Sequence, residues 1–194
     1  MKKELKFIHI TKCAGTFIED LGYKNNILWG RFHKEYGFWH SIFIDKNKEL
    51  KEKYDWFVIV RNPYDRILSE YYCKWGGIGK NNEVHTKEEF NSYIMGKIYN
   101  RSLSGHHYTE QCKYIDVNYK FNVVRLETIK KDLLKLLNEY KINIKPNFDN
   151  KINEGNKMRF TINDFSDELI EYINVVYHND FELFNYEKKK PKSN

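Results

Sequence analysis

The chain alternates short apolar runs with longer amphipathic stretches, a pattern that predicts a mixed α/β fold. Phe7, Ile8 and Ile10 form one short β-favouring run, and residues 56–60 form a second that is apolar throughout. Both runs are too short for helices and are typical of strands buried on both faces of a parallel sheet. We therefore expect a central parallel β-sheet flanked by helices, P-loop-like in topology.

A helix is expected directly after the second run. Asn62 is suited to cap it and Pro63 to occupy its first position. An apolar stripe at helical spacing follows, and we expect it to pack on the sheet. The stripe consists of Tyr64, Ile67, Leu68, Tyr71 and Trp75. Similar stripes predict helices over residues 129–140 and over residues 169–177, the latter capped by Ser166.

The segment between the first strand and the helix after it combines small residues with a positive charge. Ala14 and Gly15 let the backbone approach a ligand, and the N–H groups of the helix start would point at it. Lys12 adds a mobile charge, and Thr16 adds a hydroxyl in the first turn. The segment therefore predicts a site for phosphate or sulfate. Lys12 precedes Gly15, whereas a Walker A lysine follows its glycines, which argues against an ATPase or GTPase.

The length of 194 residues fits one domain with one sizeable core. Residues 187–192 contain four lysines and one glutamate, so they contribute +3 of the formal net charge of +6. Elsewhere lysines alternate with acidic residues, which disfavours a nucleic-acid partner. We expect one domain over residues 1–187 and a basic, disordered tail over residues 188–194.

The cysteines and the apolar runs bear on location. Cys13, Cys73 and Cys112 include no Cys-x-x-Cys pair and are odd in number, which favours a reducing compartment, although a bridge between Cys73 and Cys112 remains open. No apolar run reaches the roughly 20 residues that a membrane-spanning helix needs. The chain passes from its first charged residues directly into a strand, without a leader. A soluble, cytoplasmic protein is expected.

A second anion site is expected after the second strand. Arg61 follows that strand directly, and Ser69 lies about two helical turns after the Asn62 cap, so its hydroxyl shares a face with the strand end. An arginine fork and a hydroxyl could grip one phosphate together. The alternatives are an ion pair of Arg61 with Asp65 and a solvated Ser69.

Together, these two stretches resemble the sulfotransferases that use 3′-phosphoadenosine 5′-phosphosulfate (PAPS). The motifs are Lys-x-x-Gly-Thr at residues 12–16 and Arg-Asn-Pro-Tyr-Asp-Arg-x-x-Ser-x-Tyr at residues 61–71. The resemblance is closest to the branch with carbohydrate and heparan sulfate O-sulfotransferases. Residues 123–127 look like a later strand of that family and residues 177–186 like its C-terminal signature, so most of the chain is covered.

The resemblance implies that the first motif holds the 5′-phosphosulfate of PAPS and the second its 3′-phosphate. Lys12 would also assist catalysis, by neutralising the charge that grows on the leaving phosphate oxygen. The implied donor-binding residues are Lys12, Cys13, Ala14, Gly15, Thr16, Phe17, Arg61 and Ser69. Lys157 and Arg159 of a later loop are also implied, with a solvated loop without donor contacts as the alternative. The product is adenosine 3′,5′-bisphosphate (PAP). No metal is implied, because side chains and dipoles provide the neutralisation that magnesium gives in kinases.

The family places a histidine between the two motifs as the base that takes the acceptor's proton. His40 stands at that position. A free histidine has a pKa of about 6.5, so it is largely neutral at pH 7 and can accept a proton. His9 is the rival, but it lies within the first strand, where a packed and hydrogen-bonded histidine is expected. Cys13 is not expected to be a nucleophile, since no base with an orienting partner is evident for it.

The middle of the chain contains further histidines. His107 and Gln111 resemble a family segment near the acceptor pocket, which implies substrate contacts. His106 and His107 with Cys112 are a poor zinc set, because adjacent histidines do not easily bind one ion and no Cys-x-x-Cys pair accompanies them. We therefore expect no metal site.

The prediction is an enzyme that moves a sulfuryl group from PAPS to a hydroxyl by in-line transfer, with His40 as the base. The family branch alone favours a carbohydrate acceptor, and the oligomeric state is open. Two other classes are kept as alternatives, a P-loop-type nucleotide or nucleoside kinase and a non-catalytic nucleotide-binding protein. A kinase would require magnesium and show no preference for a 3′-phosphate, and a binding protein would transfer no sulfate.

Overall fold

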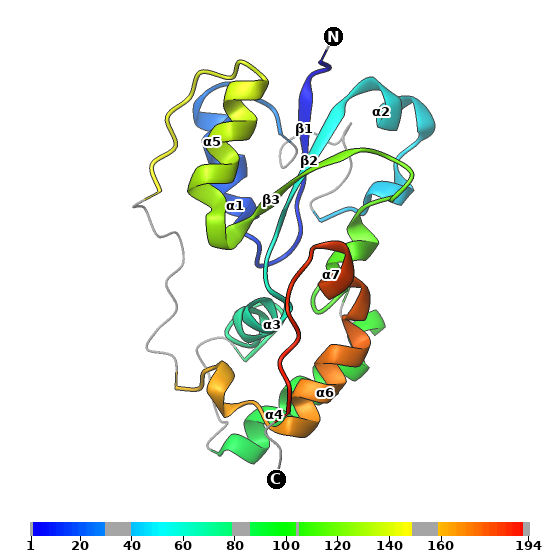
Figure 1. Ribbon diagram of the computed structural model, residues 1–194, viewed down its shortest axis with the longest axis vertical. Helices are drawn as coiled ribbons and strands as arrows, with labels where there is room; N and C mark the ends of the chain where they lie inside the picture. The colour runs from blue at the N-terminus through cyan, green and yellow to red at the C-terminus, as the bar shows by residue number, and fades with distance from the viewer. Residues whose placement is uncertain (1, 30–39, 79–85, 104, 149–158, 192–194) are drawn as a thin grey trace. The chain divides into compact units, whose positions relative to one another are not determined.

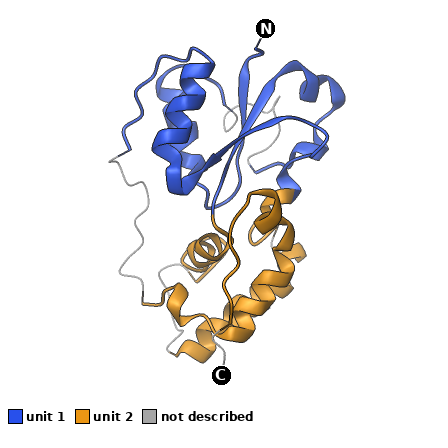
Figure 2. Cartoon of the chain, viewed as in Figure 1, with its two compact units in different colours: residues 1–61, 113–153 blue, residues 62–112, 154–194 orange. Residues whose placement is uncertain are grey.

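The computed structural model describes residues 2–29, 40–78, 86–103, 105–148 and 159–191 (Figure 1). The chain forms two compact units, each made from two segments that are distant in the sequence (Figure 2). Unit 1 comprises residues 1–61 and 113–153, and unit 2 comprises residues 62–112 and 154–194. The single domain expected over residues 1–187 stays a prediction.

Unit 1 contains a parallel sheet of three strands in the order β1 (Leu5–Ile8), β2 (Asp55–Val60) and β3 (Phe121–Arg125). β2 pairs with both neighbours in parallel. Its residues from Phe57 to Val60 are all fully buried, as expected for the central strand of a covered sheet. The predicted α/β fold with a central parallel sheet is confirmed.

In the described residues of unit 1, the sheet is accompanied by the helices α1 (Gly15–Lys24), α2 (Lys48–Lys53) and α5 (Ile129–Glu139). α5 follows β3 and packs against it. The helix expected over residues 129–140 is confirmed, with Leu133 and Leu137 of its predicted stripe in the core.

Unit 2 is helical. Its helices are α3 (Pro63–Tyr71), α4 (Lys87–Tyr99), α6 (Asp167–Val176) and α7 (His178–Leu183). Short 3-10 turns complete the described elements of the chain. They are η2 (Phe43–Asp45), η3 (Arg101–Leu103), η4 (Gln111–Tyr114), η5 (Leu126–Thr128) and η6 (Ile162–Asp164).

Two predicted helix caps are confirmed. The Asn62 side chain accepts a hydrogen bond from the backbone N–H of Tyr64 at 3.0 Å, and Pro63 begins α3. Ser166 caps α6 by accepting from Leu169 N–H at 3.2 Å. Each cap satisfies a backbone donor that the helix itself leaves without a partner.

The packing of the α3 stripe is seen within unit 2. The buried residues of α3 join a core with apolar residues of α4, α6 and α7. Trp75 is not part of that core, because α3 ends at Tyr71 and the Trp75 side chain is 78% exposed. The chain turns back there, with Gly77 N–H donating to Cys73 C=O at 2.8 Å.

Part of the expected tail is attached to unit 2. Lys189 N–H donates to the Tyr64 hydroxyl at 2.8 Å, and the Asn174 amide donates to Lys189 C=O at 3.0 Å. Lys188 Nζ also lies 2.6 Å from His178 Nδ1. This attachment depends on hydrogen bonds to residues far away in the sequence, which the local lysine-rich composition does not predict.

No helix in the described part of the chain is long and apolar enough to span a bilayer. All three cysteines of the chain are described, and no disulfide joins any two of them. The bridge that the sequence left open between Cys73 and Cys112 is therefore not formed in this structure.

Candidate functional site

The loop after β1 presents backbone N–H groups at the start of α1. Lys12 and Ala14 adopt left-handed conformations, with φ of 59° and 58°. Such conformations cost about 1–3 kcal/mol each for residues other than glycine and are concentrated at functional sites. Ala14 is the N-cap of α1, where no side chain caps the helix and no acidic residue occupies the first turn. The helix start therefore suits an anionic ligand.

Gly15 is required by its contact with His9. A Cβ atom at position 15 would lie 2.0 Å from Cδ2 of the His9 ring, closer than any real contact. The absence of a side chain thus lets the first turn of α1 sit directly on the imidazole. Gly15 of the predicted anion loop therefore also allows close packing of that loop against the His9 ring.

His9 is buried and paired with a buried carboxylate. Its Nδ1 lies 3.1 Å from Glu19 Oε1, and the two side chains are only 7% and 3% exposed. Glu19 lies on α1, one turn after Gly15, so the same helix face contacts the His9 ring twice. The expectation of a packed, hydrogen-bonded His9 is confirmed.

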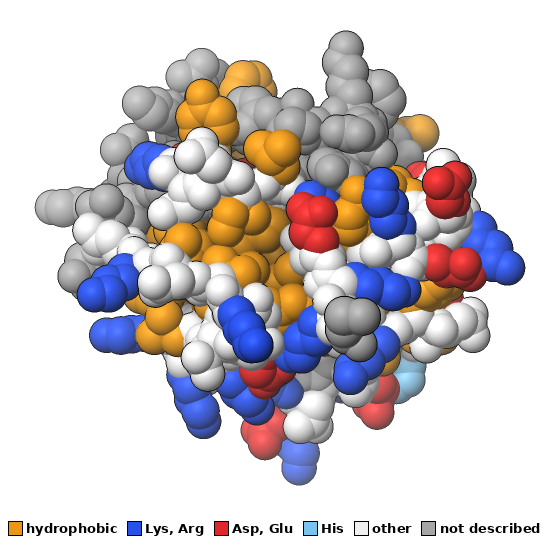
Figure 3. All heavy atoms as spheres, turned by 90° about the horizontal axis from the view of Figure 1, so that it is seen from above, with side chains coloured by type: hydrophobic (Ala, Val, Ile, Leu, Met, Phe, Trp, Pro, Cys, Tyr) orange, Lys and Arg blue, Asp and Glu red, His pale blue; other side chains and the backbone are white. Residues whose placement is uncertain are grey.

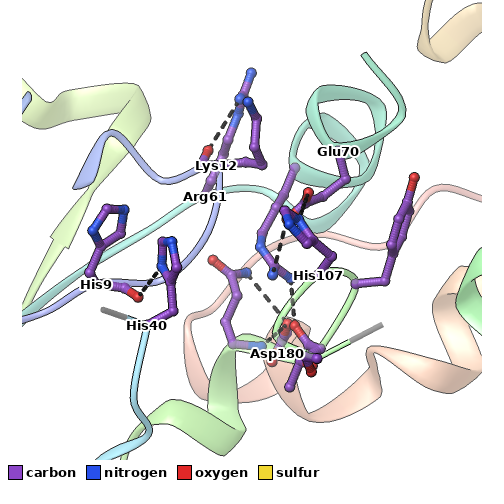
Figure 4. Close-up of polar contacts among 12 residues, drawn as sticks. His9, Lys12, His40, Arg61, Glu70, His107 and Asp180 are labelled. Atoms are coloured by element: carbon purple, nitrogen blue, oxygen red, sulfur yellow. Dashed lines mark hydrogen bonds and ion pairs between the residues drawn. The ribbon is translucent and has the colours of Figure 1, made fainter. Parts of the chain in front are cut away.

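His40 lies against His9. Its ring stands edge-on to the His9 ring, with centroids 4.2 Å apart, and its Nδ1 lies 3.1 Å from His9 C=O (Figure 4). A carbonyl only accepts hydrogen bonds, so Nδ1 carries the hydrogen, and in the neutral ring Nε2 keeps its lone pair. His40 also has a left-handed φ of 64°. With Nδ1 donating to His9, Nε2 is the ring nitrogen of His40 that has the lone pair for a proton.

Lys46 lies close in sequence to His40 and is almost completely buried. Its ammonium donates to the Ser41 hydroxyl at 3.0 Å and lies over the Trp56 ring. Burial lowers the pKa of Lys46 to about 8, against a smaller opposing effect of Asp45. This contact ties the residue after His40 to η2 and β2.

Arg61 reaches the loop of Lys12. Its Nη1 donates to Lys12 C=O at 3.4 Å, and both side chains are half-buried (Figure 4). The contact follows from topology, because β1 and β2 are parallel neighbours and their carboxyl ends lie at the same edge of the sheet. Two cationic residues from the two predicted motifs are therefore brought together within unit 1.

The other predicted residues of the first motif have different environments. Cys13 is completely buried, so only its backbone can contact a ligand. Thr16 and Phe17 are half-buried in the first turn of α1. The Phe17 ring packs on Phe148 with centroids 5.7 Å apart.

Ser69 and Arg159 belong to unit 2. Ser69 is half-buried on α3, one turn before Tyr72. The Tyr72 hydroxyl bonds to both the N–H and the C=O of Phe160, at 2.7 and 2.9 Å, and Arg159 stacks over the Phe160 ring. Tyr72 thus holds the Arg159 segment at the end of the helix that carries Ser69. Lys157 lies outside the described residues.

His107 and Gln111 have unequal access to solvent. Gln111 is fully buried, and its backbone N–H donates to Asp180 Oδ2 at 2.9 Å. Burial raises the pKa of Asp180, against the opposing hydrogen bonds from Cys112 and Gln111. His107 is 15% exposed and its Nδ1 lies 2.7 Å from Glu70 Oε2. His107 therefore offers the more accessible side chain.

Comparison with known proteins identifies the group to which this arrangement belongs. The sulfotransferase family model matches residues 2–187. The chain belongs to the sulfotransferase family. This match confirms the resemblance to PAPS-dependent sulfotransferases drawn from the two motifs, and it supports sulfuryl transfer as the reaction. Neither curated proteins nor solved structures give a significant match.

In this sulfotransferase, the sequence did not indicate the contacts of three residues, one that touches the predicted base His40 and two that touch its neighbours His9 and Ser41. Glu19 and Lys46 were not considered, and His9 was considered only as a rival to His40. One signal was present, because Gly15 and Glu19 are one helical turn apart and so share a face. The partner of that face could not be known without the fold.

The charge on one face of the sulfotransferase is mixed. On the face drawn in Figure 3, Lys and Arg side chains lie below and beside an apolar area, with Asp and Glu side chains among them. That distribution matches the alternation of charges in the sequence and differs from the continuous basic stripe of many nucleic-acid-binding proteins.

Proposed function

We propose that this sulfotransferase moves the sulfuryl group of PAPS to a hydroxyl of an acceptor, by in-line transfer. One observation supports the proposal most strongly, the contact of Arg61 with the backbone of Lys12. It joins two cationic residues at the carboxyl edge of a parallel sheet, where α/β proteins bind nucleotides. An uncapped helix start without acidic residues adjoins them and fits a phosphosulfate.

At the 5′ end of the donor, the N–H groups of residues 13–17 would orient the phosphosulfate. When bound, PAPS supplies a sulfuryl group whose transfer leaves negative charge on a phosphate oxygen. Lys12 would neutralise that charge, and a preformed cation in a partly buried site does so effectively. Ala14 and Gly15 would allow close approach of the backbone.

At the acceptor, His40 would remove the hydroxyl proton. The proton would arrive at Nε2, while Nδ1–H continues to donate to His9 C=O. The hydrogen bond from Nδ1 to His9 C=O would hold the His40 ring in one orientation during transfer. The third member of a catalytic triad orients its base in the same way. His9 and Glu19 would position the base without touching the acceptor.

At the 3′ end, Arg61 and Ser69 would bind the phosphate that distinguishes PAPS from ATP. Arg159 would add a charge from the segment that Tyr72 holds, and Lys157 would do the same. Lys12, Arg61 and the helix start supply positive charge and donors, so the proposed reaction needs no metal ion.

The acceptor is proposed to be a carbohydrate, on the basis of the family branch that the motifs resemble. His107 would contact it through the ring nitrogen that does not face Glu70. Gln111 would act indirectly. Its backbone N–H donates to Asp180, and this hydrogen bond fixes the segment that follows His107. A cytoplasmic location and the absence of nucleic-acid partners stay predictions.

The test is incubation of the full chain with isotopically labelled PAPS and a panel of sugars, polysaccharides, tyrosine peptides and small alcohols, read by mass spectrometry. A labelled sulfate ester on a saccharide is expected. A nucleotide or nucleoside kinase would instead transfer phosphate from magnesium ATP, which a parallel reaction detects. Binding of PAP without transfer to any acceptor would indicate a non-catalytic nucleotide-binding protein.

A further inference from the structure

Three side chains of types that bind metals lie together in unit 2, and only one of them, His107, has a role in the proposed sulfuryl transfer. Glu70 and Cys73 come from the last turn of α3 and the residues after it, and His107 comes from the segment before η4. One donor atom from each side chain lies within 4.8 Å of the other two. All three are shielded from solvent, Glu70 completely. The group thus combines a carboxylate, a thiol and an imidazole in the protein interior.

The orientation of Glu70 is fixed by a buried arginine. Arg66 Nη2 lies 3.7 Å from Glu70 Oε1, while its Nη1 donates to Thr109 C=O at 2.7 Å. The other carboxylate oxygen, Oε2, is directed at His107 Nδ1 at 2.7 Å (Figure 4). Arg66 therefore engages one oxygen and leaves the other turned toward His107. Support of this kind around a ligand is typical of metal sites.

A glycine turn closes around the group. Gly77 N–H donates to Cys73 C=O at 2.8 Å, which holds the turn to the end of α3. A Cβ atom at Gly76 would lie 2.4 Å from the His107 ring, so the backbone passes directly against the imidazole. The turn and the helix end together fix the three side chains from two segments of the chain.

We propose that Glu70, Cys73 and His107 form a binding site for a thiophilic divalent cation, most simply zinc. Zinc takes sulfur, nitrogen and carboxylate oxygen ligands with four-coordinate geometry, and three protein ligands leave the fourth position for water. Calcium and magnesium prefer all-oxygen sites, so the thiol and imidazole disfavour them. The ion would clip the end of α3 to the segment at His107. The acceptor contact proposed for His107 uses its other ring nitrogen.

The sequence could not show this site. Histidine 107 was considered for zinc with His106 and Cys112, its neighbours in the chain. The structure groups it instead with Glu70 and Cys73, more than 30 residues earlier. No Cys-x-x-Cys or paired-histidine spacing in the sequence indicates that these three residues come together.

The test is zinc binding by the full chain after removal of metals with a chelator. Native mass spectrometry is expected to show one zinc per chain. Competition with a chromophoric chelator is expected to show affinity lowered at least about 100-fold in Cys73→Ser and His107→Asn. Cys112→Ser and His106→Asn are matched controls, since they change the neighbouring residues of the same types, and both are expected to keep the affinity. Equal losses in all four variants would overturn the proposal.

Two measurements on the unaltered chain keep the proposal testable if a variant does not fold. Zinc is expected to slow alkylation of Cys73 by iodoacetamide but not of Cys112, as peptide mass spectrometry can show. Cobalt substitution is expected to give a thiolate-to-metal charge-transfer band. A chain that binds no zinc at equimolar concentration, or whose Cys73 reacts at the same rate with and without zinc, would refute the site.

Discussion

Each unit contains a histidine paired with a buried carboxylate, and the two pairs differ in their surroundings. His9 and Glu19 of unit 1 are 3.1 Å apart, and His107 and Glu70 of unit 2 are 2.7 Å apart. In both pairs the imidazole lies against a glycine, Gly15 or Gly76, where a Cβ atom would collide. An imidazole that packs against a glycine and pairs with a carboxylate therefore occurs in both units.

The neighbours of each pair indicate different roles. The His9 pair adjoins the uncapped start of α1, and its histidine supports the ring and Nδ1 of His40. The Glu70 pair adjoins Arg66 and the thiol of Cys73. A histidine–carboxylate pair is thus not a function in itself. The proposed roles, to position a base in unit 1 and to bind a metal in unit 2, follow from the residues around each pair.

The largest expected effect concerns the base that the unit 1 pair supports. His40→Ala should lower turnover by about 10²–10⁴-fold, the usual contribution of general base catalysis. PAP binding should not change, because His40 acts on the acceptor. Initial rates and calorimetric titration measure the two effects, and His178→Ala on the exposed start of α7 is the control. An active His40→Ala enzyme would remove the proposed role of the unit 1 pair.

The next effect separates the two carboxylates. Glu70→Gln should lower the free energy of unfolding by about 3 kcal/mol or more, because it breaks a buried ion pair with Arg66 as well as the contact with His107. Glu19→Gln should cost about 1–2 kcal/mol, since its partner His9 can remain neutral. Urea denaturation measures both, with the exposed Glu139→Gln as a reference near zero. Equal costs for the two buried carboxylates would contradict the distinction.

The glycines test the feature that the two pairs share. Gly15→Ala and Gly76→Ala should each lower the free energy of unfolding by about 1–3 kcal/mol, because the new methyl group must displace an imidazole. Gly96→Ala on α4 meets no atom within 4 Å and should instead stabilise the chain by about 0.5–1 kcal/mol. A Gly15→Ala variant with the same free energy of unfolding as the unaltered chain would show that the His9 ring does not pack against Gly15.

The smallest expected effect on stability comes from a surface ion pair of unit 2. Because this ion pair involves neither histidine pair, it provides a control for the dependence of stability on pH. Lys87 bonds to Asp164 at 2.7 Å and, with Thr161, lowers the pKa of Asp164 to about 2. Between the unfolded value of 3.8 and about 2, the unfolded chain binds more protons. The stabilisation is therefore complete above pH 3.8 and is lost as the pH falls through about 2. Urea unfolding of Asp164→Asn should lack this acid-dependent decrease, and an unchanged pH profile would exclude the contribution.

Local patterns predicted the elements well. The first two strands, the Asn62 cap, the Pro63 helix start and the helix over residues 129–139 depend on nearby residues, and their signals are local. The third strand was indicated by the family resemblance instead. The placement of α3 was not predictable in the same way, because an apolar stripe shows that a face is buried but not against what.

The residues of the candidate site were likewise predictable only where a local motif contains them. The motifs indicated Lys12 and Arg61, and the parallel pairing of β1 with β2 explains why they meet. Glu19, Lys46 and the grouping of Glu70 with Cys73 and His107 depend on tertiary contacts and carry no motif. Sequence motifs thus indicated the residues proposed to touch the donor, whereas the contacts of Glu19, Lys46 and Glu70 emerged only with the fold.

Calorimetric titration of the full chain with PAP, in buffer without magnesium, tests the central claim most directly. If Arg61 and the Lys12 loop bind a nucleotide with anions at both ends, PAP should bind at least about 10-fold more tightly than ADP, which lacks the 3′-phosphate. The preference should disappear in Arg61→Ala. Equal affinity for PAP and ADP in the unaltered chain, or binding of either only with magnesium, would contradict the account.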